Sequence, residues 1–177
     1  MEPEIKRILY ATDLSPNSVY AMRFASKIAR QNEARIIILH VIEKVSATAY
    51  ALLSSYLDED QMKARVREGI DHQVGQIRKR LDLLCEKECR FDPDLVKRVA
   101  RIEVREGYPA DEILKEADTA NANLIVMGTH GKGMLENTFV GSVAQRVMRR
   151  SRRPVFIVPL PKGPIDVSIE GAQAASA

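Results

Sequence analysis

The sequence predicts an α/β fold in which one parallel β-sheet carries helices on both of its faces. Short apolar runs alternate with longer segments of helical periodicity, and this alternation repeats five times along the chain. Two of the runs, Ile36–Val41 and Leu124–Met127, are apolar on both faces, as central strands of a parallel sheet are. No internal repeat is visible, and 177 residues fit one domain.

The first third of the chain predicts a strand, a helix and a second strand. Arg7–Ala11 forms the first strand, and Ser15 followed by Pro16 is typical of an N-cap and a first helical position. The next helix has apolar residues at spacings of three and four, namely Ala21, Phe24, Ala25 and Ile28. Ile36–Val41 is the second strand, and residues 43–57 have no clear periodicity and predict a mobile loop.

The middle third predicts a long amphipathic helix and an edge strand. The helix runs from about Asp58 to Glu88, and its apolar stripe contains Met62, Val66, Ile70, Val74, Ile77, Leu81 and Cys85. Pro93 ends this segment. Apolar and charged residues then alternate over 100–105, with Ala100, Ile102 and Val104 on one side. That alternation predicts a half-exposed strand at a sheet edge.

The last third of the chain predicts two more helices, each followed by a strand. Pro109 begins a helix that directs Ile113, Leu114 and Ala117 inward, and Leu124–Met127 is the fourth strand. A helix from Ser142 has one apolar side, made of Ala144, Val147 and Met148. Val155–Val158 is the last strand. We place one domain at residues 1–159 and expect 160–177, rich in Pro, Gly, Ala and Ser, to form a flexible tail.

Composition and charge exclude several classes of protein. Hydrophobic residues make up 45% and charged residues 29%, which is ordinary for a soluble globular chain. Two cysteines argue against a secreted disulfide scaffold, and the N-terminus has no signal-peptide pattern. The longest apolar stretch, Ile36–Ile42, is too short to cross a bilayer. We therefore expect a cytoplasmic protein with no membrane partner.

The basic residues cluster at the end of one predicted helix. Arg146, Arg149, Arg150, Arg152 and Arg153 favour a helix C-terminus, where cations stabilise the dipole. An acidic partner is the alternative. The net charge is only +3, and no aromatic residues interleave with these arginines, so a nucleic-acid partner is not expected.

The candidate site is a spaced set of glycines between the fourth strand and the following helix. Gly128-Thr129-His130-Gly131 is followed, after nine residues, by Gly141-Ser142. Helix N-termini present unpaired N–H groups and a positive dipole end, and glycine permits close approach, so the segment predicts a phosphate cradle. Gly131-Lys132-Gly133 fits neither the P-loop spacing nor a dinucleotide fingerprint after a first strand.

The spacing Gly-x2-Gly-x9-Gly-Ser resembles the nucleotide-binding motif of the universal stress protein family. Other segments are similar to that family in the same order, from Ile8–Asp13 through Leu39–Val41 and Gly107–Asp111 to Pro154–Pro159. The similarity covers about residues 4–159. It implies an adenine nucleotide alpha hydrolase-like sheet of order 3-2-1-4-5, with the ligand at the switch point between strands one and four.

The resemblance also implies a role for each site residue. Asp13 would accept hydrogen bonds from the ribose hydroxyls, and Val41 and Met127 would flank the adenine. Backbone donors around the phosphates would come from Gly128, Gly131, Gly141, Ser142 and Val143. Ala11, Thr12 and His130 complete the set; some binding members have proline where this chain has Ala11. The implied ligand is ATP, ADP or AMP, with Mg²⁺ as an optional companion that contacts Asp13 only indirectly.

Taken alone, these residues leave simpler interpretations open. Asp13 is also typical of a turn or a helix cap, and Val41 and Met127 are also ordinary core residues. For His130 we favour a solvated loop side chain, with a contact to a phosphate as the alternative. We expect no metal ligand set, because the three histidines and two cysteines lack ligand spacing.

The function that we predict is a nucleotide-dependent sensor or regulatory module in a stress response. One alternative is a slow ATP-hydrolysing enzyme, although Asp13 is the single obvious carboxylate at the site and phosphoryl transfer needs more groups. The other alternative is a dimeric interaction protein that binds no nucleotide. The resemblance further implies a homodimer through the last strand, Val155–Val158, whose apolar edge needs cover.

Overall fold

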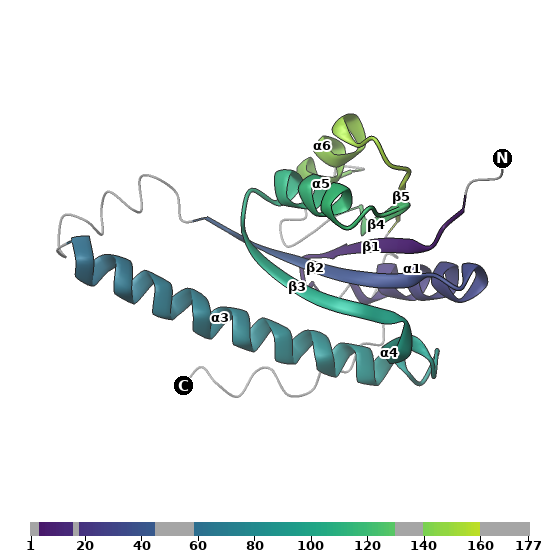
Figure 1. Ribbon diagram of the computed structural model, residues 1–177, viewed down its shortest axis with the longest axis horizontal. Coiled ribbons are helices and arrows are strands. Elements are labelled where there is room, and N and C mark those ends of the chain that lie inside the picture. The colour runs from purple at the N-terminus through teal and green to yellow at the C-terminus, as the bar shows by residue number, and fades with distance from the viewer. Residues whose placement is uncertain (1–3, 16–17, 45–58, 130–139, 160–177) are drawn as a thin grey trace.

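A computed structural model describes residues 4–15, 18–44, 59–129 and 140–159. In this part of the chain, a single sheet contains five parallel strands in the order β3-β2-β1-β4-β5 (Figure 1). The strands are β1 Arg7–Thr12, β2 Arg35–Glu43, β3 Val99–Gly107, β4 Leu124–Gly128 and β5 Val155–Val158. The predicted fold class and strand order are confirmed.

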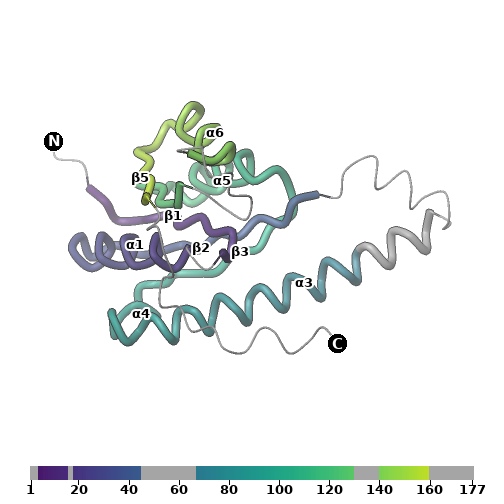
Figure 2. Tube along the Cα trace, turned by 180° about the vertical axis from the view of Figure 1, so that it is seen from behind, coloured from purple at the N-terminus to yellow at the C-terminus, as the bar shows by residue number. Residues whose placement is uncertain are grey.

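Helices cover both faces of the sheet. Their bounds are α1 Ser18–Asn32, α3 Glu59–Glu88, α4 Leu95–Arg98, α5 Pro109–Thr119 and α6 Ser142–Arg150. Figure 2 shows α1 and α3 together on one side, with α5 and α6 on the other. Each β-α-β crossover therefore places its helix on a face that needs burial.

The period-two pattern of the central strands divides the core between the two faces. In β1, Ile8 and Tyr10 pack with α1, whereas Leu9 and Ala11 pack with α5 and α6. The side chains of Ile8, Leu9 and Tyr10 are fully buried. This double burial is the reason that β1 and β2 read as continuous apolar runs.

The long helix α3 begins at Glu59 and ends at Glu88, within one residue of the prediction. Its stripe is buried at Ile77, Leu81 and Cys85, and burial raises the pKa of the Cys85 thiol to about 12. The short helix α4, which follows Pro93, was not predicted from the sequence. Of the earlier expectations, Pro16, the side chains of Met62 and Val66, most of the 43–57 loop and the 160–177 tail lie outside the described residues.

At two positions the structure departs from the apolar sides predicted for these elements. Ala100 is exposed because the β2–β3 register shifts there: Ile36 pairs with Val99 and Ile37 with Arg101, which leaves Ala100 as the extra residue of a bulge. Met148 on α6 is 42% exposed, since Ala144 and Val147 supply the buried side of that helix. The helix packs against α5 and β5 with this side.

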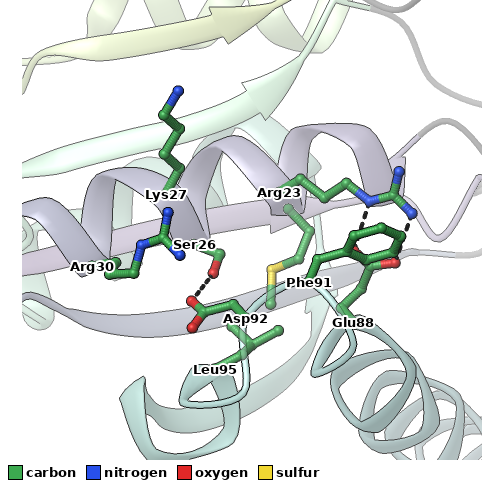
Figure 3. Close-up of a pocket in the computed structure, with 9 residues that line it drawn as sticks. Arg23, Ser26, Lys27, Arg30, Glu88, Phe91, Asp92 and Leu95 are labelled. Carbon is green, nitrogen blue, oxygen red and sulfur yellow. Dashed lines mark hydrogen bonds and ion pairs between the residues drawn. The ribbon is translucent and has the colours of Figure 1, made fainter.

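The junction between α3 and α4 is joined to α1 by charged groups. Glu88 accepts hydrogen bonds from Arg23, at 2.7 Å from Nε, and the ring of Phe91 lies 4.2 Å from the Arg23 guanidinium carbon (Figure 3). Asp92 accepts a hydrogen bond from the Ser26 hydroxyl, and a second at 2.9 Å from Arg98. Burial raises the pKa of Asp92, but these two partners outweigh it and hold the pKa below its ordinary value.

Another charged cluster joins the edge strand β3 to α5. Glu116 of α5 has no exposed surface. Its Oε1 lies 2.5 Å from Arg101 Nη2, and its Oε2 pairs with the guanidinium of Arg105. Arg101 also pairs with Glu103 at 3.0 Å. The charged side chains of β3 therefore hold this strand against α5 and are not merely solvated.

Candidate functional site

The carboxyl ends of β1 and β4 open into a cleft. The chain leaves these two neighbouring strands toward opposite faces of the sheet, which creates a crevice at their ends. The cleft has a volume of about 670 Å³, within the range of small-molecule sites. Nine of the predicted site residues line it: Ala11, Thr12, Asp13, Val41, Met127, Gly128, Gly141, Ser142 and Val143. The other two, His130 and Gly131, lie outside the described residues.

The turn after β1 holds Asp13 in one orientation. Asp13 Oδ1 accepts hydrogen bonds from the Ser15 N–H at 3.1 Å and from the Ser15 hydroxyl at 2.8 Å. Thr12 Oγ1 accepts from the Leu14 N–H at 3.1 Å, and Leu14 has a φ of 60°. A leucine in this left-handed region costs roughly 1 kcal/mol or more. The local sequence therefore maintains a strained turn that fixes one oxygen of the carboxylate.

The second oxygen of this carboxylate is the unusual feature of the site. Asp13 Oδ2 is buried, and within the described part of the chain it has no hydrogen-bond partner. A buried acceptor without a donor is costly, and native proteins rarely leave one unsatisfied. A hydroxyl donor on a bound ligand would satisfy it.

The segment between β4 and α6 is anchored at both of its ends. The Thr129 N–H donates to the Val158 carbonyl at 3.0 Å, and the Thr129 carbonyl accepts from the Gly141 N–H at 2.7 Å. Gln145 Nε2 donates to the Val140 carbonyl at 2.7 Å. These bonds bring the strand end and the helix start together at the mouth of the cleft.

The first turn of α6 presents backbone donors to this cleft. Gly141 is the N-cap and provides no side-chain cap. The N–H groups of Ser142, Val143 and Ala144 therefore have no intrahelical partner, and the positive end of the dipole adds to them. The Gly141 N–H already donates to Thr129, so the donors at this helix end are those of the following three residues.

His40 is a lining residue that the sequence analysis did not place in the site. It is buried at 7% exposure, and its Nδ1 lies 2.8 Å from the Thr12 carbonyl. Because a carbonyl only accepts, Nδ1 carries the proton in this contact. His40 pairs in register with Thr12 of the neighbouring strand, and this shared position at the strand ends is the signal that would have found it. Glu43, Gln73, Thr129, Pro109 and Ile113 also line the cleft.

The described residues contain neither a cluster of metal ligands nor a membrane-spanning helix. The described segments contain no group of three or more histidine, cysteine, aspartate or glutamate side chains arranged to hold a metal ion. No helix among them is long and apolar enough to span a bilayer.

Comparison with known proteins identifies the family. The sequence profile of the universal stress protein family matches residues 4–159. The chain belongs to the universal stress protein family. A similar member is universal stress protein MJ0577 of Methanocaldococcus jannaschii, 28% identical over 164 residues that cover 86% of this chain and 94% of that protein.

Solved universal stress proteins share the fold. The structure of MJ0577 matches with a TM-score of 0.61 at 25% identity and covers 90% of this chain and 99% of that one. The universal stress protein UspA from Lactobacillus plantarum matches with a TM-score of 0.69 at 19% identity, over 89% and 99% of the two chains. A universal stress protein in complex with cAMP matches with a TM-score of 0.51 at 24% identity, over 88% and 98%.

Proposed function

We propose that this universal stress protein binds ATP or a related adenine nucleotide in the cleft between β1 and β4. The observation that carries the proposal is that one cleft contains both a buried hydrogen-bond acceptor and a set of backbone donors. Among the described residues, Asp13 Oδ2 is a buried acceptor without a donor, and the first turn of α6 presents donors without a side-chain cap. A nucleotide supplies ribose hydroxyls for the first and phosphate oxygens for the second.

The remaining lining supports the same ligand. Asp13 would accept from the ribose, and the Ser142 hydroxyl with the N–H groups of Ser142 and Val143 would donate to phosphate. Val41 and Met127 would contact the two sides of the adenine ring. A Mg²⁺ ion that accompanies the phosphates would contact Asp13 only indirectly. One universal stress protein of this fold has been solved in complex with cAMP, another adenine nucleotide.

Binding fits this cleft better than rapid catalysis does. Efficient phosphoryl transfer needs cations that neutralise the developing charge. Among the described residues that line the cleft there is no lysine or arginine. We therefore propose a nucleotide-dependent sensor or regulatory module in a stress response, with slow ATP hydrolysis as the alternative.

A dimer is part of the same proposal. β5 is an edge strand, and Phe156 on it is 39% exposed. Edge strands with apolar residues need cover, which supports a homodimer through Val155–Val158. Occupancy of the cleft would then be read by the partner chain or by another protein.

The test is to denature freshly purified protein and to analyse the released small molecules by chromatography and mass spectrometry. We expect about one adenine nucleotide per chain, as for a tightly held ligand. In Gly141→Val, the added side chain stands at the N-cap beside the phosphate donors, and we expect at least about tenfold less nucleotide. Gly69→Val is the matched control, because a Cβ at Gly69 meets nothing within 4 Å.

Two other results would contradict the proposal. An empty wild-type protein, to which added ATP neither binds nor raises the Tm, would leave the dimeric interaction protein as the better interpretation. Equal nucleotide loss in Gly141→Val and Gly69→Val would remove α6 from the binding site.

A further inference from the structure

A second groove continues from the nucleotide cleft along α6. It has a volume of about 610 Å³, close to that of the cleft. The two depressions share four lining residues: Glu43, Pro109, Ser142 and Val143. They therefore meet at the N-terminus of α6, where the phosphates of a bound nucleotide would lie.

Arginines of α6 line the second groove. Arg146, Arg149 and Arg150 all contribute to it. Arg150 pairs with Asp111 of α5 at 2.5 Å. Within the described part of the chain, neither Arg146 nor Arg149 forms an ion pair, and both side chains are exposed. Two guanidinium groups therefore line this groove without an ion-pair partner among the described residues, although the carboxylates of Glu43 and Asp111 line it too.

Three side chains of α6 that can donate hydrogen bonds form a row along one face of the helix. Ser142, Arg146 and Arg149 are separated by four and three residues, so they share one face of the helix. From Ser142 to Arg149 the helix rises roughly 10 Å at 1.5 Å per residue. A row of donors of this length suits a chain of several phosphates, whereas a single phosphate needs only the first turn of the helix.

An exposed aromatic residue, Tyr108, also lines the groove. Tyr108 precedes α5 and is 69% exposed, an unusual position for a large ring. A tyrosine face beside guanidinium groups is a surface on which a planar base stacks. Glu43, at the end of β2, also lines both depressions and would accept from sugar hydroxyls, while the donors of α6 would face the phosphates.

We propose that the groove holds the second half of a dinucleoside polyphosphate. One nucleoside occupies the cleft, the phosphate chain follows α6 from Ser142 past Arg146 to Arg149, and the second base stacks on Tyr108. The inference rests on the proposed function, because the groove extends the same nucleotide site. A mononucleotide fills only the cleft and leaves the groove of nearly equal volume and its two arginines unused.

Titration calorimetry with ATP and with diadenosine tetraphosphate tests the proposal. We expect the dinucleoside to bind the wild-type chain about tenfold more tightly than ATP, since it adds charge-assisted and stacking contacts. The double variant Arg146→Ala/Arg149→Ala should lose that advantage, while its affinity for ATP falls by no more than about threefold. Arg152→Ala is the control, because it removes the same charge from the same arginine cluster outside the groove.

The outcomes separate this inference from the proposed function. If ATP binds and the dinucleoside binds no more tightly, or if the double variant weakens both ligands equally, the groove is not a second nucleoside site and the proposed function stands. If neither ligand binds, both proposals fall. Tyr108→Ala provides an independent check, since it should weaken the dinucleoside several-fold and leave ATP binding unchanged.

Discussion

Asp13 and Glu116 are two carboxylates with buried oxygens in opposite circumstances. Glu116 has no exposed surface, and the guanidinium groups of Arg101 and Arg105 pair with its two oxygens. Asp13 receives hydrogen bonds from Ser15 on one oxygen only, and its other oxygen is buried without a partner among the described residues. Glu116 therefore has an ion-pair partner at each oxygen, although its Oε2 forms no hydrogen bond, whereas the second oxygen of Asp13 has neither kind of partner among the described residues.

The contrast separates a structural charge from a functional one. A buried charge that has its partners holds elements together, here the edge strand β3 and the helix α5. A buried polar atom that lacks a partner persists only where something else compensates for its cost. The second circumstance is found here at the end of a strand beside a cleft, the place where open α/β sheets bind their ligands.

The largest effect that we predict is on stability at the first of these carboxylates. Glu116→Gln keeps the shape of the side chain but removes the charge that compensates two arginines. We expect the free energy of unfolding to fall by about 2–3 kcal/mol, below the range for fully buried pairs because the arginine side chains are partly exposed. Urea unfolding measures this change, and nucleotide binding by the folded variant should be unaltered.

Asp118→Asn on the same helix is the matched control. Its side chain is 64% exposed and its nearest cation, Arg153, is 3.7 Å away. Such a surface pair contributes little, so we expect a change within about 0.5 kcal/mol. Equal changes for Asp118→Asn and Glu116→Gln would mean that burial of the Glu116 charge has no special role.

The second prediction concerns Asp13, where we expect a change in nucleotide affinity and little change in stability. Asp13→Asn keeps the Oδ1 acceptor for Ser15 and replaces the unpartnered oxygen with an amide that donates. We expect the affinity for ATP to fall by a factor of about 10 to 100, the value of a hydrogen bond to a charged group. The free energy of unfolding without nucleotide should change by less than about 1 kcal/mol, because no hydrogen bond inside the described chain is lost.

Calorimetry and urea unfolding on the same preparation distinguish the two effects. A variant that binds ATP like the wild-type chain would show that the Asp13 oxygen is not a ligand contact. A variant that loses several kcal/mol of stability would make Asp13 a structural residue like Glu116, and the comparison would fail.

Much of this arrangement was accessible from sequence because local patterns determine it. The apolar runs of β1 and β2 and the stripe of α3 predicted the bounds of these elements to within two residues, since burial imposes their patterns. The spaced glycines identified the segment that joins β4 to α6. The crevice itself required the strand order, which came from the family resemblance.

What was missed depends on tertiary contacts. The bulge at Ala100 arises from the register between two strands, and no local pattern encodes it. Glu116 reads as a solvated helix residue until the arginines at alternate positions of β3 are placed beside it. The use of the Gly141 N–H by Thr129 likewise appears only once the loop ends meet.

The smallest predicted effect concerns a third carboxylate, Asp92, which resembles Glu116 in having its partners. Its pKa lies below the ordinary value of 3.8, because Ser26 and Arg98 stabilise the charged form more than burial opposes it. A depressed carboxyl pKa contributes stability that is complete above about pH 5 and is lost as the pH falls through the folded-state value. We expect Asp92→Asn to cost about 1 kcal/mol at pH 7.

The pH dependence decides the origin of this effect. Urea unfolding of the wild-type chain and Asp92→Asn at pH 7, 5, 4 and 3 should show a gap that narrows steadily below about pH 4. A gap of constant size down to pH 3 would mean that the contribution does not depend on the charge of Asp92.

Thr129 forms backbone hydrogen bonds with both the edge strand β5 and the start of α6. Its N–H is bonded to Val158 on β5, and its carbonyl is bonded to Gly141 at the head of the helix. A displacement of β5 would therefore be transmitted through Thr129 to α6, the helix whose first turn borders the cleft. The fold thus connects its outermost strand to the border of the cleft through the two backbone hydrogen bonds of a single residue.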